Sequence, residues 1–437
     1  MVKADMGEGY KLGLTRNRLF EFDNAVVFCG KREFREDGLQ RALRLLCIKE
    51  PIITSRIALE DNGEAYVVTD SVEQRVSFCD ESSTELKEKY EKDGVAFYDR
   101  AFELSYTSDG FLVIASHTAI CDARGLLRLA ADLNEFYDEP LKSVEPSEIR
   151  LISEKTDLPL EVASPVVDRL SADLDLKWQR DARAFTVDDY KAAKKAYDKK
   201  RSPVSRIGTK IAEEDMVALK EFCRKQDMDV VGLVGFAFYD ALLESMGGKK
   251  KFNKISVQAD ERLFFTDFEN YRIGAYNGAS EVSYKKKYSE GEFMSRAKAF
   301  QVDCYKNLTS TFKVFYDDAL LMKTSPSLCD GAYMYKAGLL KSKAARSLAE
   351  NYGCACERLC EYFYCNLDQS YWSGVRAYDE IYIAEPFKSR SGASISFVMI
   401  DGGAWVDFRF RVDKCDDLLA KKIVDTAMKN IIGCIRK

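Results

Sequence analysis

The first 140 residues carry apolar positions that alternate between the two-residue period of strands and the 3.6-residue period of helices. Helical spacing runs over residues 35–47 and 126–137, and Pro51 and Pro140 stop these two helices. Strand patterns cover residues 26–29, 52–59, 65–69, 97–104 and 110–115. This order predicts a unit that mixes strands and helices.

The second half of the chain has a similar organisation. Helical patterns cover residues 213–226, 230–246, 293–308 and 417–432, and strand patterns cover 254–259, 281–284, 394–400 and 404–411. Since both halves follow a similar strand–helix order, we expect an α/β (α+β) fold of two related domains, each a mixed sheet flanked by helices. A ligand site would lie in the cleft between them.

The stretch between the halves is the best candidate for a connection. Residues 168–206 are rich in lysine and aspartate, and no clear apolar stripe runs between residues 182 and 201. We therefore divide the chain into a first domain of residues 1–175, a charged connection of residues 176–206 and a second domain of residues 207–437. A length of 437 residues favours two domains, because single cores rarely grow that large.

Composition narrows the class of protein. Apolar residues make up 46% and charged residues 31%, as in ordinary globular proteins, and no window suggests a membrane span. The N-terminus lacks the apolar core of a signal peptide, so we expect a cytoplasmic protein. A net charge of −5 gives no general attraction to nucleic acid. Two lysine runs, at residues 249–251 and 285–287, are either solvated surface or a docking patch for a phosphate-bearing carrier.

Thirteen cysteines in a cytoplasmic protein are expected to stay reduced. Four of them cluster at Cys354, Cys356, Cys360 and Cys365. A zinc site favours a close pair of thiolates together with a second such pair or with histidines. This cluster has no second pair with that spacing and no histidine nearby. The spacing therefore favours packing as small apolar side chains over a metal site, and we expect no metal.

The candidate chemistry lies in the segment Ser116-His117-Thr118-Ala119-Ile120-Cys121-Asp122-Ala123-Arg124-Gly125, between an apolar strand and a helix. It contains the only histidine of the chain. An imidazole titrates near neutrality, so His117 could take and return a proton as a general base. Alternatively, His117 is a structural group that bonds to the backbone through one ring nitrogen.

Several segments, in this order, resemble the condensation-domain and coenzyme A-dependent acyltransferase superfamily. Residues 45–53 are similar to the end of its first helix, and residues 116–125 stand at the place of its HHxxxDG motif. Residues 256–262 resemble its strand that ends in arginine, residues 270–278 its glycine–asparagine loop, and residues 396–403 its late strand and turn. Each motif is weakly specific alone, whereas their shared order is more specific.

This resemblance implies two chloramphenicol acetyltransferase-like domains in a V-shaped pseudo-dimer with a tunnel between them. It implies transfer of an acyl group from a thioester, on coenzyme A or on the phosphopantetheine of a carrier protein, to a small alcohol or amine acceptor, with no bound cofactor. The second histidine of the motif would take the acceptor's proton. By the same resemblance Asp122 would pair with Arg262, and Asn277 and Ser396 are candidates to line the tunnel.

The motif departs from the superfamily's pattern. When it is anchored on Asp122, His117 falls on the first histidine and Thr118 on the catalytic second one, and Ala123 replaces the glycine. A threonine hydroxyl stays protonated at neutral pH, so it can hold a water or donate a hydrogen bond but cannot act as a free base. Three interpretations follow. A one-residue shift could turn His117 into the tunnel, transfer could proceed by proximity without a histidine, or the chain could be an inactive scaffold that binds a ligand or partner protein.

Overall fold

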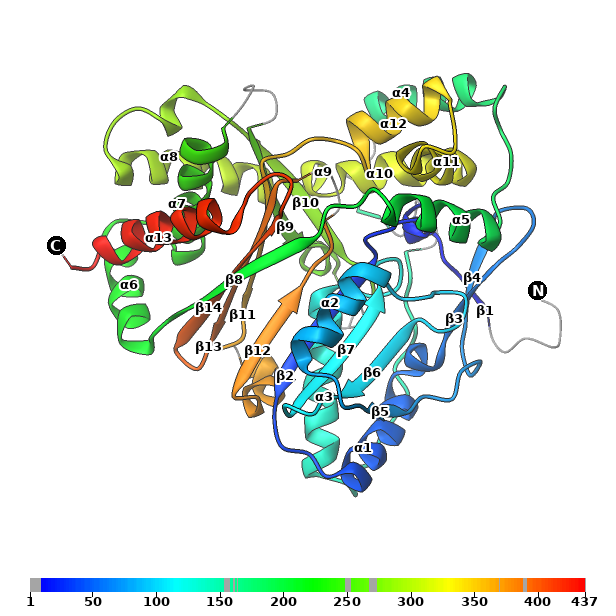
Figure 1. The fold of residues 1–437 in the computed structure, drawn as a ribbon, viewed down its shortest axis with the longest axis horizontal. Coiled ribbons are helices and arrows are strands. Elements are labelled where there is room, and N and C mark those ends of the chain that lie inside the picture. The colour runs from blue at the N-terminus through cyan, green and yellow to red at the C-terminus, as the bar shows by residue number, and fades with distance from the viewer. Residues whose placement is uncertain are drawn as a thin grey trace.

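The computed structural model describes residues 9–152, 158–159, 162, 164–247, 253–266, 273–368, 370–387 and 391–436. Figure 1 shows two lobes side by side, each built on its own sheet, with a group of helices above the lobe that contains the N-terminal part of the chain. The strands are mixed, parallel and antiparallel, and helices flank them. The α/β fold class expected from the sequence is therefore confirmed.

The first lobe contains a five-stranded sheet in the order β12-β2-β7-β6-β5. Its strands are β2 (Ala25–Lys31), β5 (Val76–Phe78), β6 (Phe102–Tyr106), β7 (Phe111–His117) and β12 (Glu380–Ala384). Helices α1 (Glu36–Lys49) and α3 (Ala123–Asp138) cover one face, and α2 (Ser83–Asp93) covers the other. A small sheet of β1 (Gly9–Lys11), β4 (Ala65–Val68) and β3 (Arg56–Leu59) lies beside it.

The second lobe contains a six-stranded sheet in the order β10-β9-β11-β13-β14-β8. Its strands are β8 (Val204–Ile211), β9 (Lys254–Asp260), β10 (Asn277–Ser283), β11 (Cys360–Asn366), β13 (Ala393–Ile400) and β14 (Gly403–Arg411). One face packs against α6 (Glu213–Lys225), α7 (Val230–Met246), α8 (Phe293–Leu308) and α13 (Asp417–Gly433). The opposite face carries Ser256 and Glu361 and turns toward the first lobe.

A third group of helices joins distant parts of the chain. It contains α4 (Pro165–Trp178), α5 (Val187–Asp198), α9 (Thr311–Val314), α10 (Tyr316–Lys323), α11 (Pro326–Ala337) and α12 (Lys343–Tyr352). Short helices of the 3-10 type are η1 (Leu14–Arg18), η2 (Pro51–Thr54), η6 (Glu261–Phe264), η8 (Lys286–Tyr288) and η9 (Ser370–Ala377). Helix α11 contacts both α5 and η1, so the group connects to the first lobe.

The structure corrects the expectation of an unpatterned connection between residues 182 and 201. Helix α5 lies there and buries Tyr190, Ala193, Lys194 and Tyr197 on one face. Tyr190 and Tyr197 stack on Phe22 at ring centroid distances of 6.2 and 4.9 Å. The buried face of α5 does not show a simple apolar pattern in the sequence, because two tyrosines and the aliphatic stem of a lysine form most of it.

No helix in the described ranges is both long and apolar enough to cross a membrane.

Candidate functional site

His117 ends β7 and lies inside the first lobe. Its side chain has no exposed surface, and its ring meets that of Phe97 edge-on at a centroid distance of 5.4 Å. Its Nδ1 accepts a hydrogen bond from the Ala119 amide at 3.1 Å. Burial lowers the pKa of His117 to about 3, so the imidazole is neutral at physiological pH. Because the ring has no exposed surface, the geometry supports a structural role rather than a catalytic one.

Thr118 occupies the position to which the resemblance assigns the general base. Its amide donates to the Asn24 carbonyl at 2.9 Å, and its Oγ1 donates to Glu21 Oε2 at 2.7 Å. The other carboxylate oxygen of Glu21 accepts from the hydroxyl of Tyr333 at 3.2 Å. Thr118 therefore donates its hydroxyl proton to the carboxylate of Glu21, which comes from a different part of the chain.

Asp122 connects the two lobes. It caps α3 by accepting from the Gly125 amide at 2.8 Å, and it accepts from the Tyr276 amide at 2.9 Å. The Arg262 guanidinium binds both carboxylate oxygens, at 2.9 and 3.1 Å. Burial alone would lower the pKa of Arg262, whereas Asp122 and Asp260 raise it above its ordinary value. Asp122 pairs with Arg262 as the resemblance implied, and the contacts of Asp122 with Arg262 and Tyr276 join the two lobes.

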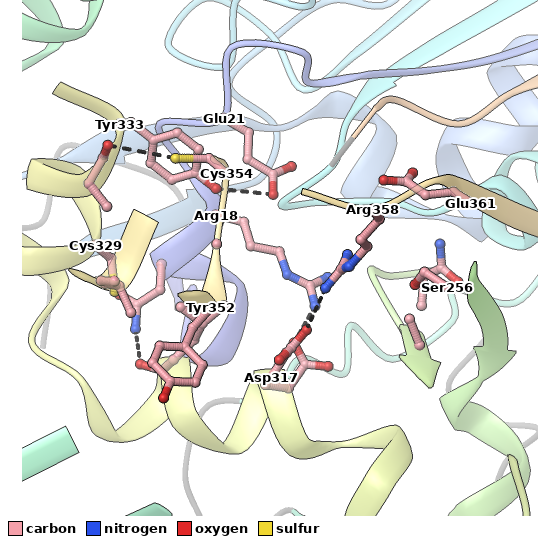
Figure 2. Close-up of a pocket in the computed structure, with 18 of the residues that line it drawn as sticks. Arg18, Glu21, Ser256, Asp317, Cys329, Tyr333, Tyr352, Cys354, Arg358 and Glu361 are labelled. Atoms are coloured by element: carbon pink, nitrogen blue, oxygen red, sulfur yellow. Dashed lines mark hydrogen bonds and ion pairs between the residues drawn. The ribbon is translucent and has the colours of Figure 1, made fainter. Parts of the chain in front are cut away.

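A cavity of about 70 Å³ lies where the lobes and the helical group meet. The first lobe contributes Asn17, Arg18 and Glu21 to its wall. The inner face of the second sheet contributes Ser256, Gln258, Asn277, Ala279 and Glu361, and α10 to α12 with the segment after them contribute most of the rest. Figure 2 shows Arg18, Glu21 and Arg358 converging from different elements toward one space.

Six charged side chains from the described part of the chain line this cavity. Arg18 and Arg358 face four carboxylates, those of Glu21, Asp317, Asp318 and Glu361, so the wall carries a formal charge of −2 when all six are ionised. A wall of this charge favours a cationic ligand over an anionic one.

Within the described ranges, three ion pairs involve the two arginines of the cavity wall. Arg18 binds the buried Asp318 carboxylate. Burial alone would lower the pKa of Arg18, whereas the carboxylates of Asp318 and Glu21 raise it. Arg358 lies 2.6 Å from Glu281 and 3.5 Å from Asp317. The two guanidinium groups therefore already have carboxylate partners.

Asp317 lines the cavity, and 41% of its side-chain surface is exposed. Burial raises its pKa above the ordinary value, against the opposing effect of Arg358. Asp317 therefore presents a carboxyl group to any ligand held there.

The two predicted tunnel residues differ in position. Asn277 lines the cavity, and its Nδ2 donates to Gln258 Oε1 at 3.0 Å. Ser396 lies on β13 in register with Phe363 of β11, on the same sheet face as Glu361, but it does not line this cavity. Its Oγ has no hydrogen-bond partner within the described ranges.

The cysteine cluster and the lysine runs do not form a site in the described ranges. Cys354 lines the cavity, but burial raises its pKa to about 12, which keeps it a thiol. No group of three or more metal-ligating side chains occurs among the residues that the structure describes. Lys285 and Lys287 both bind Asp303 at 2.8 Å, and Lys286 binds Glu290. Residues 249–251, and residues 270–272 of the expected loop, lie outside the described part.

Sequence reasoning missed several polar residues of the cavity wall, namely Arg18, Glu21, Asp317, Asp318, Tyr333 and Arg358. Arg18 and Glu21 come from a short segment at the start of the chain, and the others come from helices or loops with mixed patterns. No local motif marks them. The polar residues around Phe20 and Phe22 were the available signal, because charges between buried aromatic residues need partners.

Comparison with solved structures places the fold. The epimerization domain from the third module of tyrocidine synthetase B matches 100% of this chain and 98% of its own, at 13% identity and a TM-score of 0.62. The trichothecene 15-O-acetyltransferase of Fusarium sporotrichioides matches 97% and 94%, at 11% identity and a TM-score of 0.63. Polyketide synthase associated protein 5 of Mycobacterium tuberculosis matches 100% of both chains, at 10% identity and a TM-score of 0.59.

No protein-family model matches the sequence, and no curated protein matches it. The chain has the fold of condensation domains and related acetyltransferases, including the two-lobed arrangement that the sequence led us to expect. At 10 to 13% identity, this likeness establishes the fold and leaves the reaction open.

Proposed function

We propose that this protein transfers an acyl group from a thioester to an amine or hydroxyl acceptor held in the cavity between its lobes. The observation that carries the proposal is the position of that cavity. It lies at the lobe junction, and the Thr118–Glu21 hydrogen bond connects it to the segment that resembles a catalytic motif. The fold, shared with condensation domains and an O-acetyltransferase, supports the same reaction class.

The donor in this proposal is acyl-coenzyme A or an acyl group on the phosphopantetheine of a carrier protein, and it is a substrate rather than a bound cofactor. The acceptor's nitrogen or oxygen attacks the thioester carbon, a C–N or C–O bond forms, and the C–S bond breaks to release the thiol. Holding both reactants in one orientation lowers the activation barrier of such a transfer, at best by roughly 7–11 kcal/mol.

The competing function is a non-catalytic scaffold that binds a ligand or a partner protein. One observation favours it: His117 is sealed in the first lobe, and Thr118, at the position of the base, donates its hydroxyl proton to Glu21. Neither side chain is free to accept a proton from a ligand in the described geometry.

The deciding experiment incubates the protein with a panel of acyl-coenzyme A and acyl-phosphopantetheine thioesters and with short amines and alcohols. Thiol release and product mass are measured. The proposal expects an amide or ester that disappears when Ala279→Phe fills the cavity, and that persists in Ser283→Phe, a change at an exposed position of the same strand. Ligand binding without any product would instead support the scaffold.

A further inference from the structure

The carboxylate of Glu21 differs from its acidic neighbours in the cavity. Asp318 is paired with Arg18, and Asp317 lies 3.5 Å from Arg358. Among the described residues Glu21 forms no ion pair, and its hydrogen-bond partners are two neutral hydroxyl groups, those of Thr118 and Tyr333. Only 9% of Glu21 is exposed. Arg18 interacts electrostatically with Glu21 but binds Asp318, so the Glu21 carboxylate remains available to a cation that arrives with a ligand.

The two hydroxyls orient this carboxylate without neutralising it. Burial and the negative charge of Glu21 both raise the pKa of Tyr333 well above its ordinary value, so the Tyr333 hydroxyl remains a hydrogen-bond donor. Each carboxylate oxygen has two accepting positions, and Thr118 and Tyr333 use one on each oxygen. Figure 2 shows the carboxylate next to the space that Arg18 and Arg358 also border. One accepting position on each oxygen is left for a ligand.

We propose that Glu21 binds the ammonium group of a primary-amine acceptor and takes its proton, in the place of the histidine that the resemblance leads one to expect. This inference rests on the proposed acyl transfer and narrows its acceptor to amines. The formal charge of −2 on the cavity wall favours the same class of ligand.

The proton and bond changes balance as follows. The ammonium ion gives one proton to Glu21 and becomes a neutral amine, which attacks the thioester carbon. The C–N bond forms, the C–S bond breaks, and the second proton of the nitrogen passes to the leaving thiolate. The products are an amide and a free thiol, and Glu21 returns its proton to solvent.

Propylamine and 1-propanol, each with the same acyl-coenzyme A, test the inference in wild-type protein, Glu21→Gln and Glu21→Asp. Gln keeps the size and can still accept from Thr118, so the variant is expected to fold. The exposed Glu33→Gln is the matched control. We expect the wild type to prefer the amine at least tenfold, Glu21→Gln to lose on the order of 10²-fold or more in amide formation, and Glu21→Asp to retain an intermediate rate.

A wild type that prefers propanol, or a Glu21→Gln variant within twofold of wild type, would overturn the role of Glu21 while leaving acyl transfer intact. If no thioester is consumed by any form, the proposed transfer itself fails. Propylamine binding by calorimetry then decides the recognition step: at least tenfold weaker binding by Glu21→Gln, with Glu33→Gln unchanged, supports the ammonium site, and equal binding refutes it.

Discussion

The two ends of the segment from His117 to Asp122 behave in opposite ways. Asp122 has a complete set of partners, comprising the Arg262 guanidinium and two backbone amides. At the other end, His117 is packed against Phe97, and Thr118 donates its hydroxyl proton to Glu21. Asp122 thus keeps the partners that join the lobes. At the other end of the segment, neither His117 nor Thr118 is placed to act as a base. A motif's place in a fold therefore does not establish its reaction.

Removing the Asp122 carboxylate is expected to produce the largest effect. Asp122→Ala leaves Arg262 buried without its bidentate partner and removes the cap of α3, so it should lower the free energy of unfolding by about 3–5 kcal/mol. Denaturant unfolding measures this. Asp138→Ala removes a carboxylate that is 54% exposed and pairs with Arg32, and should cost less than about 1 kcal/mol. Equal losses in the two variants would show that Asp122 does not join the lobes.

His117 should make the protein sensitive to mild acid. Its pKa is about 3 when folded and 6.5 in the unfolded chain, so between these values the unfolded state binds more protons. Stability therefore falls as pH decreases, by about 2 kcal/mol between pH 7 and pH 5 from this group. In His117→Asn the amide oxygen can still accept from Ala119, but nothing titrates, so this part of the pH dependence should vanish. An unchanged profile would mean that the imidazole reaches solvent.

The hydrogen bond from Thr118 should matter to a smaller extent. Thr118→Val keeps the shape but removes one of the two donors to Glu21, and should cost about 1–2 kcal/mol because the carboxylate is buried. Thermal unfolding in wild type and variant measures the difference. A Val variant as stable as the wild type would indicate that water replaces the hydroxyl, and that Glu21 is less enclosed than the structure shows.

The smallest effect is expected at Ser396. Its hydroxyl has no hydrogen-bond partner in the described ranges, so Ser396→Ala should change the free energy of unfolding by less than about 0.5 kcal/mol. Denaturant unfolding beside Thr118→Val compares the two buried hydroxyls directly. A loss as large as that of Thr118→Val would reveal a partner that Ser396 engages in solution.

Elements with a strong apolar period were predictable from the sequence alone. The periodicity predicts helices at residues 230–246 and 293–308, which are the bounds of α7 and α8. Helix α5 was not predicted, because tyrosines form much of its buried face. Strand β12 was also not predicted. It comes from residues 380–384 yet pairs with β2 in the first sheet, so its partner lies far away in the sequence.

The sequence by itself determined the α/β class, most of the described strands and fewer than half of the described helices. The resemblance added the salt bridge between Asp122 and Arg262. These features follow from periods of a few residues, or from a motif that keeps its order along the chain. Only the tertiary structure decided that His117 is buried and that Glu21 meets Tyr333, which is 312 residues away. Burial and electrostatic pairing depend on side chains brought together across both lobes, and no local pattern encodes which distant groups will meet.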